Sequence, residues 1–474
     1  MAGRLVSFCV CLAAFLLIDL AAQTPPALAP PPVIVAIRNV TVIPATASAP
    51  ITGATVVITG DRISALGPAS TTVIPKQARI VDGSGKFLMP GLIEMHAHSS
   101  KARASALGLF VANGVTTIRD MGGDHEELLR WRREIRAGSR VGPRMFIAGP
   151  YLEAASRVEQ MRKDPPSERV EPFERLRIPI GSPGDARRVI GELAKKDVDF
   201  IKIRTVQDND TYLALNEAAH ANKLRLTGHV PVGMDPEFVL KAGQDDIEHG
   251  FYPPVKIASR DERLALWRKF AARGVVVVPT MVVIKKSVLA PLDHLKAMME
   301  DTAGKIEPRR PYVSLYSVKD WREQLSETTP ARQNAYQEIA ANSIRDFREM
   351  HEAGVELLTG SDVAVINIFP GSSLHDELEL FVSELKMTPA EAIERATRRA
   401  AKWLGIEGET GTIEQGKIAD LLLLDANPLE DIRNTRRIAA VVLRGALYDR
   451  AGIDGLLAKV KAAEDITVDD WGRK

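Results

Sequence analysis

The chain has 474 residues, 45% of them hydrophobic and 26% charged, which is enough for one large globular domain and a smaller one. Its formal net charge is +1 and Lys and Arg are dispersed, which argues against nucleic acid or an acidic membrane as a partner. Both cysteines, Cys9 and Cys11, lie in an apolar N-terminal stretch, so the rest of the chain has neither disulfides nor thiolate metal ligands.

Residues 1–22 have the layout of a cleaved secretory signal peptide. Arg4 supplies the positive start, residues 5–18 are mostly apolar, and the small residues Ala21 and Ala22 follow. About fourteen apolar residues are too few to span a bilayer comfortably, so an uncleaved membrane anchor is the less favoured alternative. Residues 23–32 hold five prolines and predict a flexible lead-in. We therefore expect a secreted or periplasmic protein with no membrane attachment after cleavage.

The next segment, residues 33–88, and a later one, residues 406–450, share strand patterns with Gly turns. Residues 33–43 alternate, and hairpins are predicted over 54–66, turning at Gly60-Asp61, and over 78–88, turning at Asp82-Gly83. Residues 411–424 and 438–448 have the same texture. We expect the two ends of the chain to form one small β-sandwich domain, followed by a C-terminal tail over residues 451–474.

Residues 89–405 alternate between strand and helix patterns, which predicts an α/β fold. The strands are expected at residues 92–96, 116–119, 144–148, 200–204, 224–229, 246–249, 275–278 and 355–359. Helical patterns between them cover residues 185–196, 210–222, 261–273 and 333–353. Eight strands alternating with helices predict a (β/α)8 TIM-type barrel. A doubly wound open sheet is the alternative, but no Gly-rich dinucleotide loop follows the first strand.

A last helix is predicted over residues 388–403. Thr388 is its expected N-cap, Pro389 its first residue and Glu391 the second half of a capping box, and Gly405 ends it. Two polar stretches, residues 151–184 and 285–329, interrupt the alternation after the third and seventh strands. In a barrel both lie at the face where active sites are found, as ordered lids or as disordered loops.

Candidate metal ligands stand at the ends of five predicted strands. His96 and His98 alternate at the end of the first strand, so their side chains point the same way. The other candidates, each flanked by glycine, small or apolar residues, are Lys202, His229, His249 and Asp362. An isolated His-x-His pair is more often structural, but several such strand ends together indicate a metal site.

Lys202 lies in a strongly apolar strand, Phe200-Ile201-Lys202-Ile203. A charged amine is costly to bury, so the side chain either loses its proton, or reacts with CO₂ to give an anionic carbamate, or extends its ammonium to the rim. A carbamate would convert this lysine into a ligand able to bridge two metal ions.

At these residues the chain resembles the amidohydrolase superfamily, over roughly residues 33–450. It is most similar to the imidazolonepropionase-related branch with prolidase-like and Xaa-dipeptidases, which act on dipeptides and N-acyl amino acids. The matching motifs are Pro90-Gly-Leu-Ile-Glu-Met-His96-Ala-His98, Phe200-Ile-Lys202-Ile, Gly228-His229-Val, Ile247-Glu-His249-Gly, Thr359-Gly-Ser-Asp362, residues 396–405 and residues 411–421.

The resemblance implies a binuclear metal hydrolase that cleaves a C–N amide bond with a metal-bridging hydroxide. His96, His98 and Asp362 would hold one divalent ion, His229 and His249 the other, and carboxylated Lys202 would bridge them. Asp362 would act as the catalytic base and then acid. Zinc is the expected metal, with Mn, Co or Ni as alternatives.

Three further residues are candidates for binding a small-molecule substrate with a carboxylate. Arg204 and Arg119 lie at strand ends and could form bidentate pairs, or could be structural ion pairs. His375 follows the last strand and could edge the pocket. The text Arg204-Thr205-Val206-Gln207 replaces a Gly-rich stretch found in many dipeptidase-like members, which weakens a dipeptide as substrate.

Two other functions stay open, and so does a homo-oligomer. One is a mononuclear deaminase or cyclic-imide hydrolase of the same fold, against which Lys202 argues. The other is a non-catalytic binding barrel, against which the complete set of ligands argues.

Overall fold

The computed structural model describes residues 33–46, 48–163, 173–252, 254–326, 328–463 and 465. The predicted signal peptide and lead-in lie outside these residues, and so do residues 464 and 466–474 of the predicted tail. The described chain from Val33 onward belongs to one compact unit. Within these ranges every helix is too short or too polar to span a bilayer.

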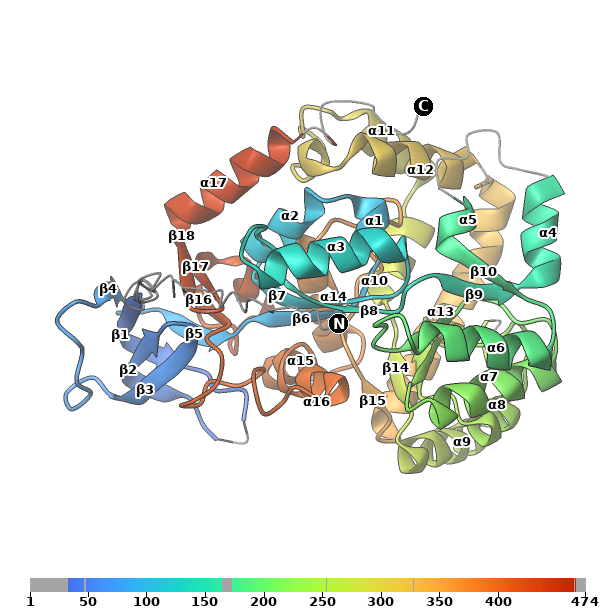
Figure 1. The fold of residues 1–474 in the computed structure, drawn as a ribbon, viewed down its shortest axis with the longest axis horizontal. Helices are drawn as coiled ribbons and strands as arrows, with labels where there is room; N and C mark the ends of the chain where they lie inside the picture. The colour runs from blue at the N-terminus through green and yellow to red at the C-terminus, as the bar shows by residue number, and fades with distance from the viewer. Residues whose placement is uncertain are drawn as a thin grey trace, which may run out of the picture. The chain divides into compact units, whose positions relative to one another are not determined.

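Both ends of the chain contribute strands to one eight-stranded sheet (Figure 1). Its order is β18-β17-β16-β5-β1-β2-β3, and β4 also pairs with β1. The strands are β1 (Ile34–Val42), β2 (Ile51–Thr59), β3 (Arg62–Pro68), β4 (Arg79–Asp82), β5 (Phe87–Pro90), β16 (Leu421–Leu424), β17 (Ile438–Leu443) and β18 (Ala446–Asp449). Leu88 of β5 pairs with Val42 on one side and Leu423 on the other, and residues from both ends share a hydrophobic cluster. A sandwich arrangement of this sheet stays a prediction.

One of the two predicted hairpins forms and the other does not. β2 and β3 pair antiparallel around Gly60-Asp61, which confirms the first hairpin. The second, over residues 78–88, is wrong, because β4 and β5 each pair in parallel with β1. β1 is irregular between Ile37 and Val40, and the N–H of Gly83 donates to the carbonyl of Arg38 there. This irregularity lets one long strand take two short partners in succession.

The middle of the chain contains two parallel sheets, which confirms the α/β class. One has the order β6-β7-β8 and the other β10-β9-β11-β12-β13-β14-β15. Their strands are β6 (Leu92–Ala97), β7 (Val115–Asp120), β8 (Arg144–Ile147), β9 (Tyr151–Ala154), β10 (Arg177–Ile180), β11 (Ile201–Ile203), β12 (Leu226–Gly228), β13 (Asp246–Glu248), β14 (Val276–Val278) and β15 (Glu356–Leu357). Hydrogen bonds from Met95 N to Thr359 O (3.0 Å) and from Asp199 N to Ile147 O (2.9 Å) link the two sheets.

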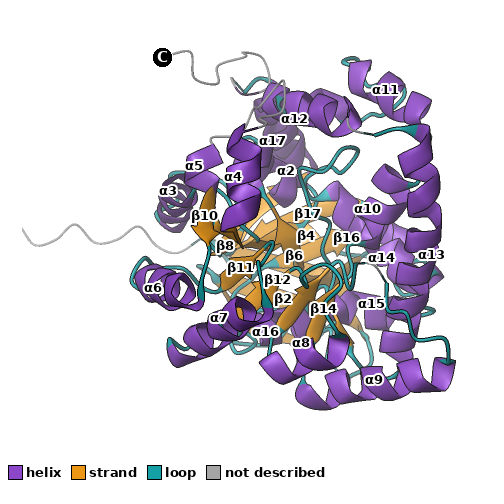
Figure 2. Ribbon diagram, turned by 90° about the vertical axis from the view of Figure 1, so that its right-hand side faces the viewer, coloured by secondary structure: helices purple, strands orange, loops and turns teal. Residues whose placement is uncertain are grey.

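Helices lie around the outside of these parallel strands (Figure 2). They are α1 (Ser99–Ala102), α2 (Ala106–Ala112), α3 (His125–Arg136), α6 (Pro183–Leu193), α7 (Asn209–Ala221), α8 (Pro236–Ala242), α9 (Arg260–Arg273), α10 (Met281–Val283), α13 (Pro330–Glu352), α14 (Ser372–Ser383), α15 (Pro389–Arg395), α16 (Arg398–Leu404) and α17 (Arg450–Lys461). The side chains of Ser182 and Asp208 cap α6 and α7 by accepting from the backbone N–H three residues further on, so these helices begin one or two residues before the predicted starts at residues 185 and 210.

The predicted helix over residues 388–403 is two helices, α15 and α16. The capping box of Thr388 and Glu391 is confirmed. The helix is interrupted at Ala396 and Thr397, where Thr397 leaves the helical region and the carbonyl of Ala396 accepts from Ile93 N of β6 (2.7 Å). A carbonyl bonded to a strand is not available to the next turn, which explains the break.

The two interrupting stretches contain secondary structure of their own. The described part of residues 151–184 holds β9, α4 (Ala155–Lys163), α5 (Phe173–Leu176), β10 and the start of α6. Residues 285–329 hold most of the π-helical turn η1 (Ile284–Val288), α11 (Leu292–Glu300), the short turn η2 (Arg310–Tyr312) and α12 (Leu315–Ser326).

Candidate metal centre

Four histidines and one aspartate meet where the parallel strands end. His96 is in β6 and His98 follows it, His229 follows β12, and His249 follows β13. Ring centroids lie 5.2 Å apart for His96 and His98, 4.7 Å for His96 and His249, and 5.0 Å for His229 and His249. Strand ends from distant parts of the chain therefore bring these side chains into one cluster.

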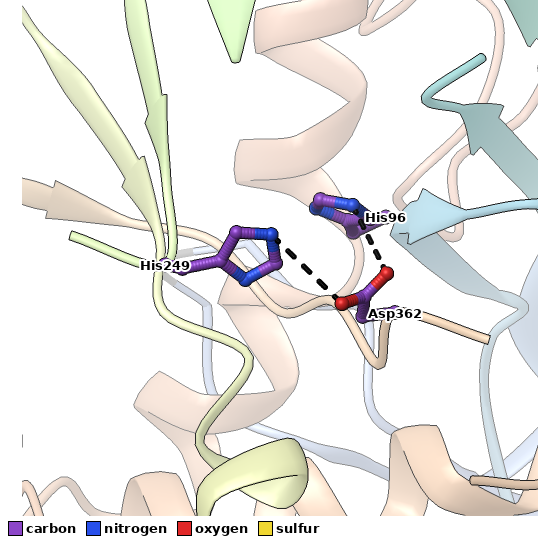
Figure 3. A group of neighbouring side chains, drawn as sticks. All are labelled: His96, His249 and Asp362. Atoms are coloured by element: carbon purple, nitrogen blue, oxygen red, sulfur yellow. Dashed lines mark ion pairs between the residues drawn. The ribbon is translucent and has the colours of Figure 1, made fainter. Parts of the chain in front are cut away.

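The carboxylate of Asp362 faces the rings of His96 and His249 (Figure 3). Its Oδ1 is 3.3 Å from His96 Nε2 and 3.4 Å from His98 Nε2, and its Oδ2 is 3.8 Å from His249 Nε2. One ligand atom each from His96, His249 and Asp362 lie within 4.8 Å of one another, an arrangement that could hold a metal ion.

The backbone around the cluster is strained and closely packed. His249 and Asp362 have φ of 64° and 57°, a region that residues other than glycine rarely adopt. Gly360 could not carry a side chain, because a Cβ there would lie 2.8 Å from His96 Cβ. Such strain persists only where the surrounding structure enforces it, and it is common where ligands must point inward.

The other ring nitrogen of three histidines is already engaged. Nδ1 of His96 lies 2.5 Å from Glu248 Oε2, that of His98 2.9 Å from the Gly122 carbonyl, and that of His249 2.6 Å from Thr280 Oγ1. Because acceptors hold Nδ1–H, the Nε2 lone pairs face Asp362, as metal-binding histidines require.

Burial favours the neutral form of three of the clustered rings, those of His96, His229 and His249. It holds the pKa of His96 and of His229 well below the usual value and lowers that of His249 to about 4. Imidazoles that are neutral at physiological pH can donate a lone pair to a cation without first losing a proton.

Lys202, in the middle of β11, is only 1% exposed, and burial lowers the pKa of its amine to about 8. Neither its Nζ nor the Nε2 of His96 has a hydrogen-bond partner among the described residues. Buried polar atoms without partners are rare, because each costs the free energy of its lost hydration. Both atoms therefore fit a site that an additional group completes, such as a divalent cation and a carbamate.

The profile of the amidohydrolase family matches residues 87–447, which is most of the chain. The chain belongs to the amidohydrolase family. The resemblance found in the sequence motifs is therefore confirmed.

The amidohydrolase has relatives with known names. Ochratoxinase from Aspergillus niger is 24% identical over 458 residues, which cover 85% of this chain and 84% of the relative. A candidate prolidase from Bifidobacterium longum has a structure with a TM-score of 0.68 and 27% identity, covering 91% of this chain and all of its own. A Xaa-Pro dipeptidase with bound methionine has a TM-score of 0.63 at 21% identity, covering 88% of this chain and all of its own, a likeness of fold.

Arg119 of the amidohydrolase is not placed to clamp a substrate. It is fully buried, and it donates to Asp246 Oδ2 (2.9 Å), Glu248 Oε1 (2.5 Å) and the Met95 carbonyl (2.6 Å). The interpretation as a substrate clamp is therefore corrected in favour of a structural ion pair. Glu248 also forms a hydrogen bond with His96 Nδ1, so the ion pair helps to fix the orientation of the His96 ring.

His375 is likewise not at the cluster. It is 1% exposed on α14, with Nδ1 2.9 Å from Thr435 Oγ1 and Nε2 3.0 Å from the Asn113 carbonyl. Both ring nitrogens are used within the protein, so the prediction that it edges the pocket is wrong. It joins α14 to α2 and to the turn η3 (Ile432–Arg436).

Arg204, unlike Arg119, is not held in an ion pair among the described residues. Its guanidinium carbon lies 5.5 Å from the centre of the Tyr151 ring, and no carboxylate of the described residues pairs with it. Burial lowers the pKa of His229 and of His249 most, and the charges of Lys202 and then Arg204 lower both values further. The Arg204 guanidinium therefore lies close enough to the cluster for its charge to act on these two rings. Tyr151 in turn has its hydroxyl 3.2 Å from His98 Nδ1.

Several residues of the centre could not be singled out from the sequence. Glu248 and Thr280 orient histidines, and Glu94 accepts from His96 N, Ser361 N and Ser361 Oγ, which ties β6 to the segment before Asp362. One signal was present: Asp246 and Glu248 alternate on one face of a buried strand and require a buried cation as partner.

Proposed function

We propose that this amidohydrolase is an exported, metal-dependent hydrolase that cleaves the C–N amide bond of a dipeptide or an N-acyl amino acid. What carries the proposal is the cluster of four histidines and Asp362, in which burial lowers the pKa of His96, His229 and His249, together with the buried Lys202 amine, which has no hydrogen-bond partner among the described residues. Family membership and relatives named for prolidase, Xaa-Pro dipeptidase and ochratoxinase activity support amide hydrolysis.

The proposal assigns each ligand. His96, His98 and Asp362 would hold one divalent ion, zinc in the first instance, and His229 and His249 a second. Lys202 Nζ, whose pKa of about 8 leaves part of it unprotonated near neutral pH, would attack CO₂, form an N–C bond and lose a proton. The resulting carbamate would bridge the ions. When bound, the ions would polarise the scissile carbonyl and make water a stronger nucleophile near neutral pH.

Asp362 would move the proton. Its carboxylate lies between three imidazole nitrogens, and its backbone N–H donates to the His96 carbonyl (2.8 Å), which fixes its direction. A carboxylate held there can accept the proton of the attacking water and deliver it to the leaving amine as the C–N bond breaks.

The fold and location belong to the same proposal. We infer that the parallel strands close into a (β/α)8 barrel over residues 89–405, completed by a sandwich domain from residues 33–88 and 406–450. The hydrogen bonds of Met95 and Asp199 that link the two sheets support closure. The signal-like residues 1–22 support export to the periplasm or beyond, which N-terminal sequencing of the protein recovered outside the cytoplasm would test.

One observation favours a second candidate, a mononuclear deaminase or cyclic-imide hydrolase. Among the described residues, one group of three, His96, His249 and Asp362, places its ligand atoms within 4.8 Å of one another, which is enough for a single ion. This candidate gives Lys202 no role.

Metal content and product identity decide between the two. We expect the purified protein, prepared with bicarbonate, to hold about two divalent ions per chain. It should release free amino acids from a panel of N-acyl amino acids and dipeptides, and lose this activity on chelation. One ion per chain with ammonia as product would establish the deaminase instead, while a metal-free inactive protein would contradict both.

Arg204 is proposed to bind the substrate carboxylate. Replacing Arg204 with methionine should raise KM for an N-acyl amino acid by about 10- to 100-fold, because a hydrogen bond between charged groups contributes about 1.5–3 kcal/mol. KM for the same compound with its carboxyl amidated should stay unchanged. Steady-state kinetics on both compounds, with exposed Arg187→Met as control, would contradict the assignment if both KM values rose together.

A further inference from the structure

The insertion after β14 has a hydrophobic cluster of its own that reaches the loop carrying Asp362. This cluster is built mainly from α11 and α12, with Trp321 at its centre, 1% exposed. Two of its members, Ile366 and Phe369, come from the segment just after Asp362. The ring of Trp321 meets that of Phe369 edge to face at 5.8 Å. The insertion therefore packs directly on residues 363–369.

Hydrogen bonds from α12 hold the backbone of this loop. Gln324 Nε2 and Trp321 Nε1 both donate to the carbonyl of Ala364, at 3.3 and 3.2 Å. Gln324 Oε1 accepts from the backbone N–H of Ile366 at 3.1 Å. Asp320 Oδ2 accepts from the same Nε2 at 2.8 Å, which sets the orientation of the carboxamide. One side chain thus binds the loop through an acceptor and a donor at once.

The loop that is held in this way is strained. Asp362, Ala364 and Asn367 have φ of 57°, 101° and 64°, although none is glycine. Ala364 has no polar side chain to stabilise this conformation locally. Residues in such regions cost about 1–3 kcal/mol each and persist only when their surroundings enforce them. The direction of the Asp362 side chain depends on this backbone, so contacts to Ala364 and Ile366 bear on it.

The same helix also contacts the loop of the first ligand strand. Ser317 Oγ donates to the Lys101 carbonyl at 3.2 Å, in α1 directly after His98. α12 therefore touches the segments that follow two different ligand-bearing strands, β6 and β15. A helix in that position can set the distance between His98 and Asp362.

We infer that Gln324 is a positioning residue: from outside the site, its carboxamide holds the strained Ala364–Ile366 backbone that aims Asp362 at the histidines. This inference rests on the proposed function in so far as Asp362 handles the proton. The hydrogen bonds of Gln324 predict a defect in turnover, because misdirection of Asp362 weakens proton transfer, while substrate binding by other residues is retained.

Replacing Gln324 with methionine keeps the length and bulk of the side chain and removes its two hydrogen bonds to the loop together with the one to Asp320. We expect kcat to fall about tenfold with KM within about twofold, since small misplacements of a reacting group cost one to two orders of magnitude. Amide hydrogen exchange of residues 361–370 should be faster in the same variant. Loss of metal to a chelator should also be faster, because Asp362 is a proposed ligand.

Gln333→Met is the matched control. Gln333 also donates from its carboxamide to backbone carbonyls of the insertion, those of Ala290 (2.5 Å) and Val288, and neither of these hydrogen bonds reaches the Asp362 loop. It should leave kcat and exchange over residues 361–370 unchanged. Equal effects of the two variants on kcat would reduce Gln324 to a general stabiliser of the insertion. Unchanged exchange, or faster exchange with normal kcat, would also overturn the inference.

Failure of the proposed function would be recognised separately. If the unaltered protein hydrolysed no amide, the exchange and chelation measurements on both variants would still report whether Gln324 holds the loop. Faster exchange and faster metal loss in Gln324→Met alone would support the positioning role, and parity with Gln333→Met would exclude it.

Discussion

Replacing Lys202 with methionine is expected to abolish amide hydrolysis and, at the same time, to stabilise the metal-free protein. Mutating residues that only support the ligands of a metal lowers metal affinity or activity by about 10- to 100-fold. Losing a bridging ligand should therefore lower kcat by at least about 100-fold. The gain in stability has a separate cause. The Lys202 amine is buried with no hydrogen-bond partner in the described part of the chain, and methionine fills similar space with no group to desolvate.

The pH dependence of this gain follows from the pKa of Lys202. Burial lowers that pKa from 10.5 to about 8, so between these values the unfolded chain binds a proton that the folded, metal-free protein does not. The free energy of unfolding therefore rises with pH across this window, by up to about 3 kcal/mol, and the penalty is complete below pH 8. In Lys202→Met this rise should disappear.

Chemical denaturation of metal-free, CO₂-free protein between pH 7 and 10.5 measures the gain in stability and its pH dependence. Metal content and kcat, both measured with bicarbonate present, test the bridging role. Lys256→Met, at an exposed lysine, is the control for loss of a charge. A Lys202→Met protein that kept two metal ions and normal kcat would exclude the bridging role. A variant less stable than its parent would show that Nζ has a partner in the folded protein.

Replacing Arg119 with methionine should have the largest effect on stability. Asp246 and Glu248 are fully buried with Arg119 between them, and removing the guanidinium leaves two carboxylates without their cation. Breaking a buried ion pair in this way costs about 3–5 kcal/mol. Because Glu248 also bonds His96 Nδ1, the variant should bind metal more weakly even where it remains folded.

Urea denaturation at neutral pH tests the size of this loss. Arg188→Met is the comparison, because Arg188 forms ion pairs with Asp185 and Glu192 at the surface, and pairs of that kind contribute about 0–1 kcal/mol. Similar midpoints for the two variants would mean that the buried carboxylates take up protons at little cost. In that case the Arg119 variant should become markedly less stable as pH rises.

The identity of the clustered residues could be read from local sequence. His96 and His98 end an apolar strand, and residues two apart in a strand point to the same side, so their side chains were expected to point together. His229, His249 and Asp362 each follow a short strand with glycine close by. The same local logic located the start of α15, because the capping box of Thr388 and Glu391 is decided within four consecutive residues.

What the sequence could not show depends on partners far along the chain. Arg119 meets Asp246 and Glu248 across 127 and 129 residues, so its role as clamp or ion pair could not be decided from its own strand. His375 pairs with Asn113 and Thr435 in the same way. The break between α15 and α16 depends on the hydrogen bond from Ile93 to Ala396. The hairpin predicted over residues 78–88 does not form because β4 and β5 pair with β1 instead. Long-range pairing overrides local pattern in each case.

The sheet shared by both ends of the chain makes the protein sensitive to its own completeness. β5 needs β16 on its free side, and about 330 residues separate Pro90 from its partner Leu421. Until the last strands have been synthesised, β5 keeps an open apolar edge, which is a surface that chaperones and proteases recognise and that can aggregate. A copy truncated before β16 would therefore carry every proposed ligand and still lack the partner of β5, so we expect it to be degraded or to aggregate.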